Sequence, residues 1–113
     1  MELTLLYFDG CPNSMIAYDR LVIVADELKD VDVTVTRRLV ETLEDAERTG
    51  FRGSPSILVD GVDLFGEFDA PFGLSCRRYR TPDGPTGAPT VEQLRTALKS
   101  RQRSARAERD AAN

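Results

Sequence analysis

The sequence predicts one domain of the α/β class with the element order β-α-β-α-β-β-α. An apolar run, Leu3–Phe8, ends at the turn pair Asp9-Gly10 and is followed by a long helical pattern. A second segment, Val31–Leu39, alternates valines with polar residues, which is typical of a half-buried strand. A third segment, Ser56–Val59, runs into Asp60-Gly61, a dipeptide that favours a tight hairpin. Strands and helices that alternate along the chain indicate this fold class.

Helical spacing and capping residues define the other elements. The first helix is expected from about Asn13 to Lys29, with a core-facing stripe of Ala17, Leu21, Val24, Ala25 and Leu28. Thr42 is expected to cap a short second helix, and Gly50 is expected to end it. Thr90 is expected to begin the last helix, with Gln93 completing a capping box.

The region between the hairpin and the last helix is less regular. Residues 66–75 carry Gly and Pro among apolar side chains, and Cys76–Thr81 is predicted to be a short edge strand because charges are typical of edges. Pro82–Pro85 is predicted to be a turn. The domain is expected to span residues 1–100, because residues 101–113 lack an apolar stripe and are expected to form a frayed polar tail.

Composition limits the possible function. The 113 residues carry 15 basic and 19 acidic side chains, a net charge of −4, which argues against nucleic-acid binding. There is no apolar run long enough to cross a membrane. Met1-Glu2-Leu3 lacks the basic start of a signal peptide, so a cytoplasmic location with reduced thiols is expected. The absence of histidine excludes Cys-His and Ser-His-Asp catalysis and most zinc sites.

Cys11 is the strongest candidate for chemistry. It lies between the first strand and the first helix, and Pro12 suits the start of that helix because no backbone donor is needed there. The positive end of a helix dipole stabilises a thiolate, which raises the reactivity of the cysteine. The alternative is a buried structural cysteine. The flanking pattern favours the reactive thiol.

Ser14 is the second candidate, because it completes a Cys11-x-x-Ser14 motif. A hydroxyl cannot close a disulfide, so the motif has no dithiol cycle, but a hydroxyl can stabilise a thiolate by hydrogen bonding. Ordinary first-turn helix chemistry explains Ser14 equally well.

With Cys11-Pro12-Asn13-Ser14 after the first strand and Ser54-Pro55 before the third, the sequence resembles the thioredoxin/glutaredoxin superfamily, in particular small bacterial thioredoxin-like proteins with a CxxS motif. The resemblance covers about residues 3–100. It implies a mixed four-stranded sheet with helices on both faces. It also implies a cis-proline at Pro55 that lies beside Cys11, where the adjoining backbone pairs with thiol substrates. Three features depart from the family: Gly10 replaces the usual tryptophan, Ser14 replaces the second cysteine, and 63–66 lacks the glycine pair that binds glutathione.

The resemblance implies a thiol–disulfide oxidoreductase of the monothiol type that acts on protein or small-molecule disulfides. Cys11 would form the mixed disulfide, and Cys76 or an external low-molecular-weight thiol would resolve it. No bound cofactor and no metal are expected. The catalytic candidates are Cys11, Ser14 and Cys76, and the substrate-binding candidates are Pro12, Ser54, Pro55 and Arg77. Arg77, with Arg78 and Arg80, would attract carboxylates of a thiol cofactor, whereas the alternative is a solvated edge strand.

Two other functions remain open. One is a binding module without catalysis, for which a homodimer is one option. Its contact would use the apolar residues of the irregular segment: Phe65, Phe68, Phe72 and Leu74. Met15, Ile16, Val22 and Ile23, which lie off the core stripe of the first helix, suggest a second partner surface. The weaker alternative is handling of soft metals or organomercurials by the two cysteines, because thiolates suit such ions.

Overall fold

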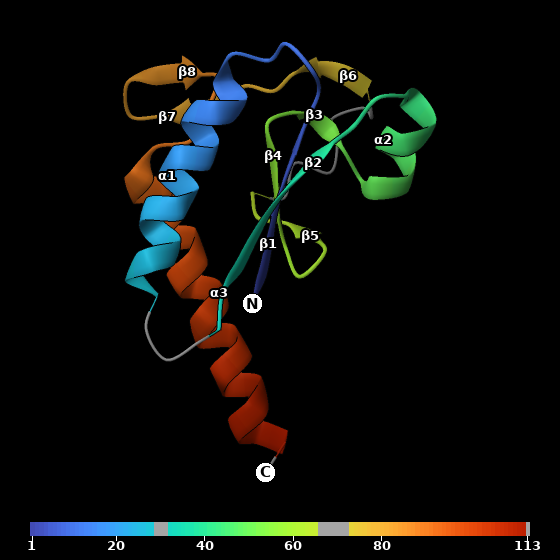
Figure 1. Ribbon diagram of the computed structural model, residues 1–113. Helices are drawn as coiled ribbons and strands as arrows, with labels where there is room; N and C mark the ends of the chain where they lie inside the picture. Colours follow the sequence, from blue (N-terminus) through green and yellow to red (C-terminus); the bar gives the residue numbers. More distant parts are fainter. Residues whose placement is uncertain (29–31, 66–72, 113) are drawn as a thin grey trace.

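The computed structural model describes residues 1–28, 32–65 and 73–112 and shows an α/β fold. Figure 1 shows a central sheet with two helices on one side and a shorter helix on the other. The elements are β1 (Glu2–Tyr7), α1 (Asn13–Glu27), β2 (Thr34–Leu39), α2 (Leu43–Thr49), β3 (Arg52–Ser54), β4 (Ser56–Val59), β5 (Val62–Asp63), β6 (Gly73–Cys76), β7 (Tyr79–Thr81), β8 (Gly84–Thr86) and α3 (Val91–Ala112).

The main sheet is mixed and has the strand order β2-β1-β4-β5. β1 runs parallel to β2 and antiparallel to β4, and β4 forms a hairpin with β5. Two small ladders complete the described strands: β3 pairs with β6 in parallel, and β7 pairs with β8 antiparallel. The predicted α/β class and the mixed four-stranded sheet are therefore confirmed.

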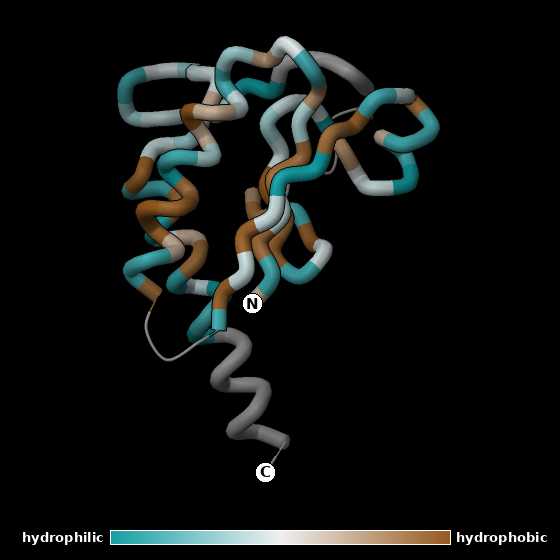
Figure 2. The backbone as a smooth tube through the Cα atoms, viewed as in Figure 1, coloured by the Kyte–Doolittle hydropathy of each residue, from teal (hydrophilic) through white to brown (hydrophobic). Residues whose placement is uncertain are grey.

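Alternating side chains of the strands form one core on each face of the sheet. On the first face, Leu5 and Ile57 pack with Leu21 of α1 and Leu94 of α3 in the larger cluster. On the second face, residues of β1, β4, α2 and the connections on either side of α2 form a smaller cluster: Leu6, Val40, Ala46, Phe51 and Leu58. In Figure 2, apolar residues recur along the strands of the main sheet and along α1, which packs on the first face. Helices thus cover both faces.

The predicted helix caps are confirmed in detail. The Thr42 side chain accepts a hydrogen bond from the Asp45 amide at 3.0 Å, and Gly50 ends α2 in the left-handed region with φ 78°. At the start of α3, the Gln93 amide donates to Thr90 Oγ1 at 3.0 Å. The Thr90 amide donates to the Gln93 side chain at 2.9 Å, which completes the capping box.

The Asp60-Gly61 turn also forms as predicted. Asp60 has φ 50° and Gly61 has φ 87°, the positive values that a two-residue hairpin turn between right-twisted strands requires. An Asp60 side-chain oxygen accepts from the Glu2 amide at 2.7 Å, so the turn is fastened to the start of β1. This turn lies at the amino-terminal end of β1.

The structure differs from the sequence prediction in several places. β3 was not predicted, and β8 begins within the predicted turn Pro82–Pro85. The expected strand 76–81 is divided, because β6 ends at Cys76 and β7 begins at Tyr79. α3 continues to Ala112, where a frayed tail was expected. Ala, Arg, Glu and Gln, which dominate residues 101–112, have high helix propensity, and this favours a helix without an apolar stripe.

Some predictions fall outside the described residues. They include the start of the second predicted strand at Val31 and most of the irregular segment 66–75, with Phe68 and Phe72. The side chains of residues 73–76, which include Leu74 and Cys76, are also outside the described part.

Candidate active site

Cys11 lies in the short connection between the carboxyl end of β1 and the start of α1. Its amide donates to the carbonyl oxygen of Phe8 at 3.3 Å, which closes a tight turn around Gly10, whose φ is 85°. A positive φ suits glycine because it has no Cβ. Pro12 takes the N-cap position with φ −69°, one residue before the place expected from the sequence. The fold thus presents Cys11 directly before the first turn of a 15-residue helix.

The exposure of Cys11 is small but its flanks are open. The residue is 7% exposed, while Gly10 and Pro12 on either side of it are exposed to solvent. The Cys11 residue itself is therefore largely covered, whereas the chain on either side of it is open to solvent.

Ser14 is buried in the first turn of α1, and its side chain hydrogen-bonds to the backbone. Its Oγ donates to the carbonyl oxygen of Cys11 at 3.0 Å. The Ser14 amide points at the same carbonyl, at 3.4 Å. The hydroxyl proton is therefore engaged by the main chain of Cys11, which is the helix chemistry weighed above as the alternative to thiolate stabilisation.

Pro55 lies at the same end of the sheet as Cys11. The register of β1 with β4 pairs Leu6 with Ser56, so the residue before Ser56 is beside the carboxyl end of β1. The Ser54–Pro55 peptide bond is cis, as the resemblance implies. Both residues are fully buried, and the Tyr79 hydroxyl donates to the Pro55 carbonyl oxygen.

The backbone of Cys76 is brought to this end by the ladder between β3 and β6. Cys76 is the register partner of Ser54, and the Arg77 amide donates to the Ser54 carbonyl oxygen at 2.9 Å. The topology therefore gathers the backbone of Cys11, Pro55 and Cys76 at one end of the sheet, although they are far apart in the sequence.

Arg77 does not face solvent in this structure. It is 3% exposed, and its guanidinium holds the buried Asp63 carboxylate through two contacts, 2.7 Å from Nη1 and 3.1 Å from Nη2. Nη1 also donates to Ser56 Oγ at 3.3 Å, and the guanidinium carbon lies 4.8 Å from the Tyr79 ring centre. The charge expected to attract a substrate carboxylate is instead bound to an internal one, and only Arg78 and Arg80 are exposed.

This buried ion pair was missed by reasoning from the sequence. Asp63 and Arg77 are 14 positions apart. Asp63 is the last residue of β5, and Arg77 directly follows β6. The only sequence signal is an aspartate two residues after a hairpin glycine, in a strand that begins with valine. That pattern does not predict that Asp63 pairs with an arginine.

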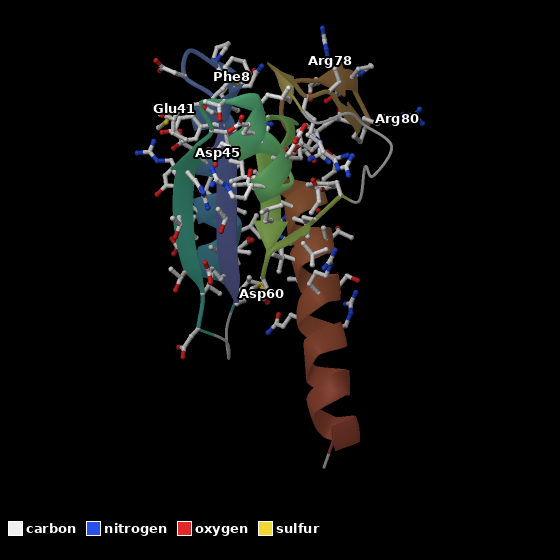
Figure 3. All side chains as sticks on the ribbon, turned by 90° about the vertical axis from the view of Figure 1, so that its right-hand side faces the viewer. Phe8, Glu41, Asp45, Asp60, Arg78 and Arg80 are labelled. Atoms are coloured by element: carbon white, nitrogen blue, oxygen red, sulfur yellow. The ribbon has the colours of Figure 1, made fainter. Side chains whose placement is uncertain are left out.

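A pocket of about 220 Å³ opens beside the Cys11 loop, at the carboxyl ends of the parallel strands β1 and β2. Its lining combines apolar and acidic residues: Phe8, Asp9, Leu39, Val40 and Glu41. Figure 3 shows Phe8 and Glu41 at one end of the sheet and Asp60 at the other, with Arg78 and Arg80 across the top of the molecule. Sequence reasoning did not find this pocket, because it depends on which strands lie side by side.

The described residues also bear on membrane insertion and on metal binding. No helix among them is both long enough and apolar enough to cross a membrane. Within the same residues, no group of three or more Cys, Asp or Glu side chains is arranged to hold a metal ion.

Comparison with known proteins adds no family assignment. Neither the protein-family models, nor the curated proteins, nor the solved structures contain a match to this chain.

Proposed function

We propose that this protein is a thiol–disulfide oxidoreductase of the monothiol type with a thioredoxin-like fold, in which Cys11 forms the mixed disulfide. The position of Cys11 at the amino terminus of α1 carries the proposal. α1 has no side-chain cap and no acidic residue in its first turn. The Ser14 amide is engaged by the Cys11 carbonyl oxygen, so the positive end of the dipole and the other first-turn amides are what the helix offers to an anion beside it. In this proposal that anion is the sulfur of Cys11 as it attacks.

The topology supports the thioredoxin-like part of the proposal. The mixed four-stranded sheet, the cysteine between β1 and α1, and the proline immediately before β4 are features that the resemblance implies. Helices on both faces are also consistent with it.

The proposed reaction is an exchange of disulfides. The Cys11 thiolate attacks one sulfur of a substrate disulfide, the S–S bond breaks, and the second sulfur leaves as a thiolate that takes a proton from water. A low-molecular-weight thiol then attacks the substrate sulfur of the mixed disulfide, which restores Cys11 and leaves that sulfur bonded to the external thiol. A second molecule of the external thiol releases the second substrate thiol and forms the external disulfide. The two external thiols thus supply the two electrons that the substrate disulfide gains.

The test compares the full chain with the variants Cys11→Ser and Cys76→Ser, using bis(2-hydroxyethyl) disulfide as oxidant. Intact mass and peptide mapping are expected to show a mercaptoethanol adduct on Cys11 in the parent and in Cys76→Ser. Cys11→Ser is expected to show little adduct at early times. If the parent and Cys11→Ser were to react at the same rate, Cys11 would not be the nucleophile.

A non-catalytic binding module is the second candidate, and exposed apolar residues on α1 favour it. Met15, Ile16 and Ile23 are 49%, 44% and 51% exposed, although a solvent-facing helix flank is usually polar. Phe65 belongs to the other surface that the sequence suggested for a partner, the apolar residues of the irregular segment. It is half-buried and packs edge-on against Tyr79, with ring centres 5.3 Å apart. Sedimentation at increasing concentration tests this candidate: self-association that Ile16→Glu abolishes would support it, and a monomer at every concentration would oppose a homodimer.

A further inference from the structure

We infer that the pocket beside Cys11 selects disulfides whose flanking group is cationic, and that it disfavours carboxylate-bearing disulfides such as oxidised glutathione. This inference rests on the proposed function, because it names the substrate class of the same thiol. It is carried by the chemistry of the pocket lining and by the position of the pocket in the fold.

The pocket lies outside the carboxyl ends of β1 and β2, which are parallel neighbours in the main sheet. Ligands of open α/β sheets bind on this side of the sheet, beyond the carboxyl ends of the strands. Phe8 and Asp9 follow β1, while Val40 and Glu41 follow β2. The Phe8 carbonyl oxygen accepts a hydrogen bond from the Cys11 amide, so two residues of the pocket lining, Phe8 and Asp9, belong to the same turn as Cys11.

The charge of the pocket is negative. Asp9 and Glu41 are both exposed, and in the described part of the chain neither carboxylate has an ion pair or a side-chain hydrogen bond. The nearest basic residue on β2 by sequence, Arg38, is held by Asp45 of α2 at 3.5 Å. Two unneutralised carboxylates around apolar Phe8 and Leu39 suit an ammonium or guanidinium group on a short aliphatic stem.

The arginines do not reverse this preference at the pocket. Arg77 is buried against Asp63, as described above. Arg78 and Arg80 are exposed, but they belong to the opposite side of this end of the molecule in Figure 3. An anionic group therefore gains nothing beside Asp9 and Glu41.

The experiment measures the rate at which three small disulfides modify Cys11 in the full chain at low ionic strength. Cystamine carries two ammonium groups, bis(2-hydroxyethyl) disulfide is neutral, and 3,3′-dithiodipropionate carries two carboxylates. Peptide mapping counts adducts on Cys11 separately from those on Cys76. The ratio of the cystamine rate to the dithiodipropionate rate is compared with the ratio for a neutral free thiol, N-acetylcysteine amide.

The expected ratio for Cys11 is higher than for the free thiol. Asp9→Asn and Glu41→Gln are each expected to lower it by about two- to fivefold, as exposed charge pairs allow. The matched control is Asp60→Asn, which removes the same charge at the far end of the sheet and keeps an oxygen for the Glu2 amide. It is expected to leave the ratio almost unchanged. Salt at 0.5 M is expected to reduce the preference, because exposed charges are screened.

The outcomes separate the two proposals. If Cys11 reacts with no disulfide, the proposed function fails. If Cys11 reacts with all three but its ratio equals that of the free thiol, or if Asp60→Asn lowers the ratio as much as the pocket variants do, the substrate preference is overturned and the proposed function stands.

Discussion

Ser14 occupies the position at which a dithiol motif would carry its second cysteine. Its hydroxyl is bound to the Cys11 carbonyl, so it stabilises the turn that presents the thiol. The residue lies in the first turn of α1, three positions after Cys11, which lies just before that turn. On a helix surface a spacing of three positions brings side chains close together.

The first prediction follows from this spacing. Ser14→Cys is expected to form an internal disulfide with Cys11 under mild oxidant, because disulfide geometry needs Cα atoms within about 7 Å. Non-reducing peptide mapping measures the bond. The control is Ser100→Cys, which adds an exposed thiol on α3. Failure of the introduced thiol at position 14 to pair with Cys11 would show that the turn cannot hold a redox motif.

Individual residues also show what the sequence could predict. Thr42, Gly50, Thr90 and Asp60-Gly61 were identified correctly because caps and tight turns depend on neighbours within a few positions. The environment of Arg77 could not be predicted in this way. Its carboxylate partner is brought to it by the packing of separate strands, which no local pattern encodes.

At the scale of elements, the Asp63–Arg77 pair connects β5, at the edge of the main sheet, to the segment between β6 and β7. Arg77 also reaches Ser56 at the start of β4. The inward turn of Arg77 coincides with the break between β6 and β7, which accounts for the division of the expected strand 76–81.

The second prediction concerns this pair. Asp63→Ala is expected to destabilise the fold by about 3–5 kcal/mol, because it removes the carboxylate that accepts from Nη1 and Nη2 of a buried guanidinium. The double variant Asp63→Ala/Arg77→Met is expected to be more stable than Asp63→Ala, since it also removes the buried cation. Urea unfolding at pH 7 measures both. A single variant as stable as the parent would mean that the pair is solvated in solution.

The third prediction concerns the packing of α1 on α3. Arg95 of α3 donates to the Glu27 carboxylate of α1 at 2.8 Å, and this hydrogen bond lowers the pKa of Glu27 below its ordinary value. The stability that the pair contributes is therefore present above the ordinary pKa and is lost as the pH falls through the lowered value.

Glu27→Gln is accordingly expected to reduce the urea midpoint at pH 7 and to have a smaller effect at pH 3. The control is Glu47→Gln, which changes an exposed glutamate on α2. If the difference between Glu27→Gln and the parent were the same at both pH values, the ion pair would contribute nothing to the pH dependence.

At the scale of the whole molecule, periodicity was enough to predict the α/β class and the β-α-β-α-β pattern at the start of the chain. Apolar alternation and helical stripes are local properties, whereas the mixed four-stranded sheet was implied by the family resemblance. The pocket and the β3–β6 ladder could not be predicted, because they arise where segments distant in sequence meet. The account of function therefore depends on one end of the sheet, where the Cys11 loop, Pro55 and the backbone of Cys76 come together.

The central claim is that the amino terminus of α1 makes Cys11 the more reactive thiol. Limiting iodoacetamide at pH 7, followed by peptide mapping, tests it on the folded chain and on the chain unfolded in urea. The account predicts that Cys11 is alkylated before Cys76 in the folded chain and that the preference disappears in urea, because it depends on the helix. Equal or reversed labelling in the folded chain would contradict the account.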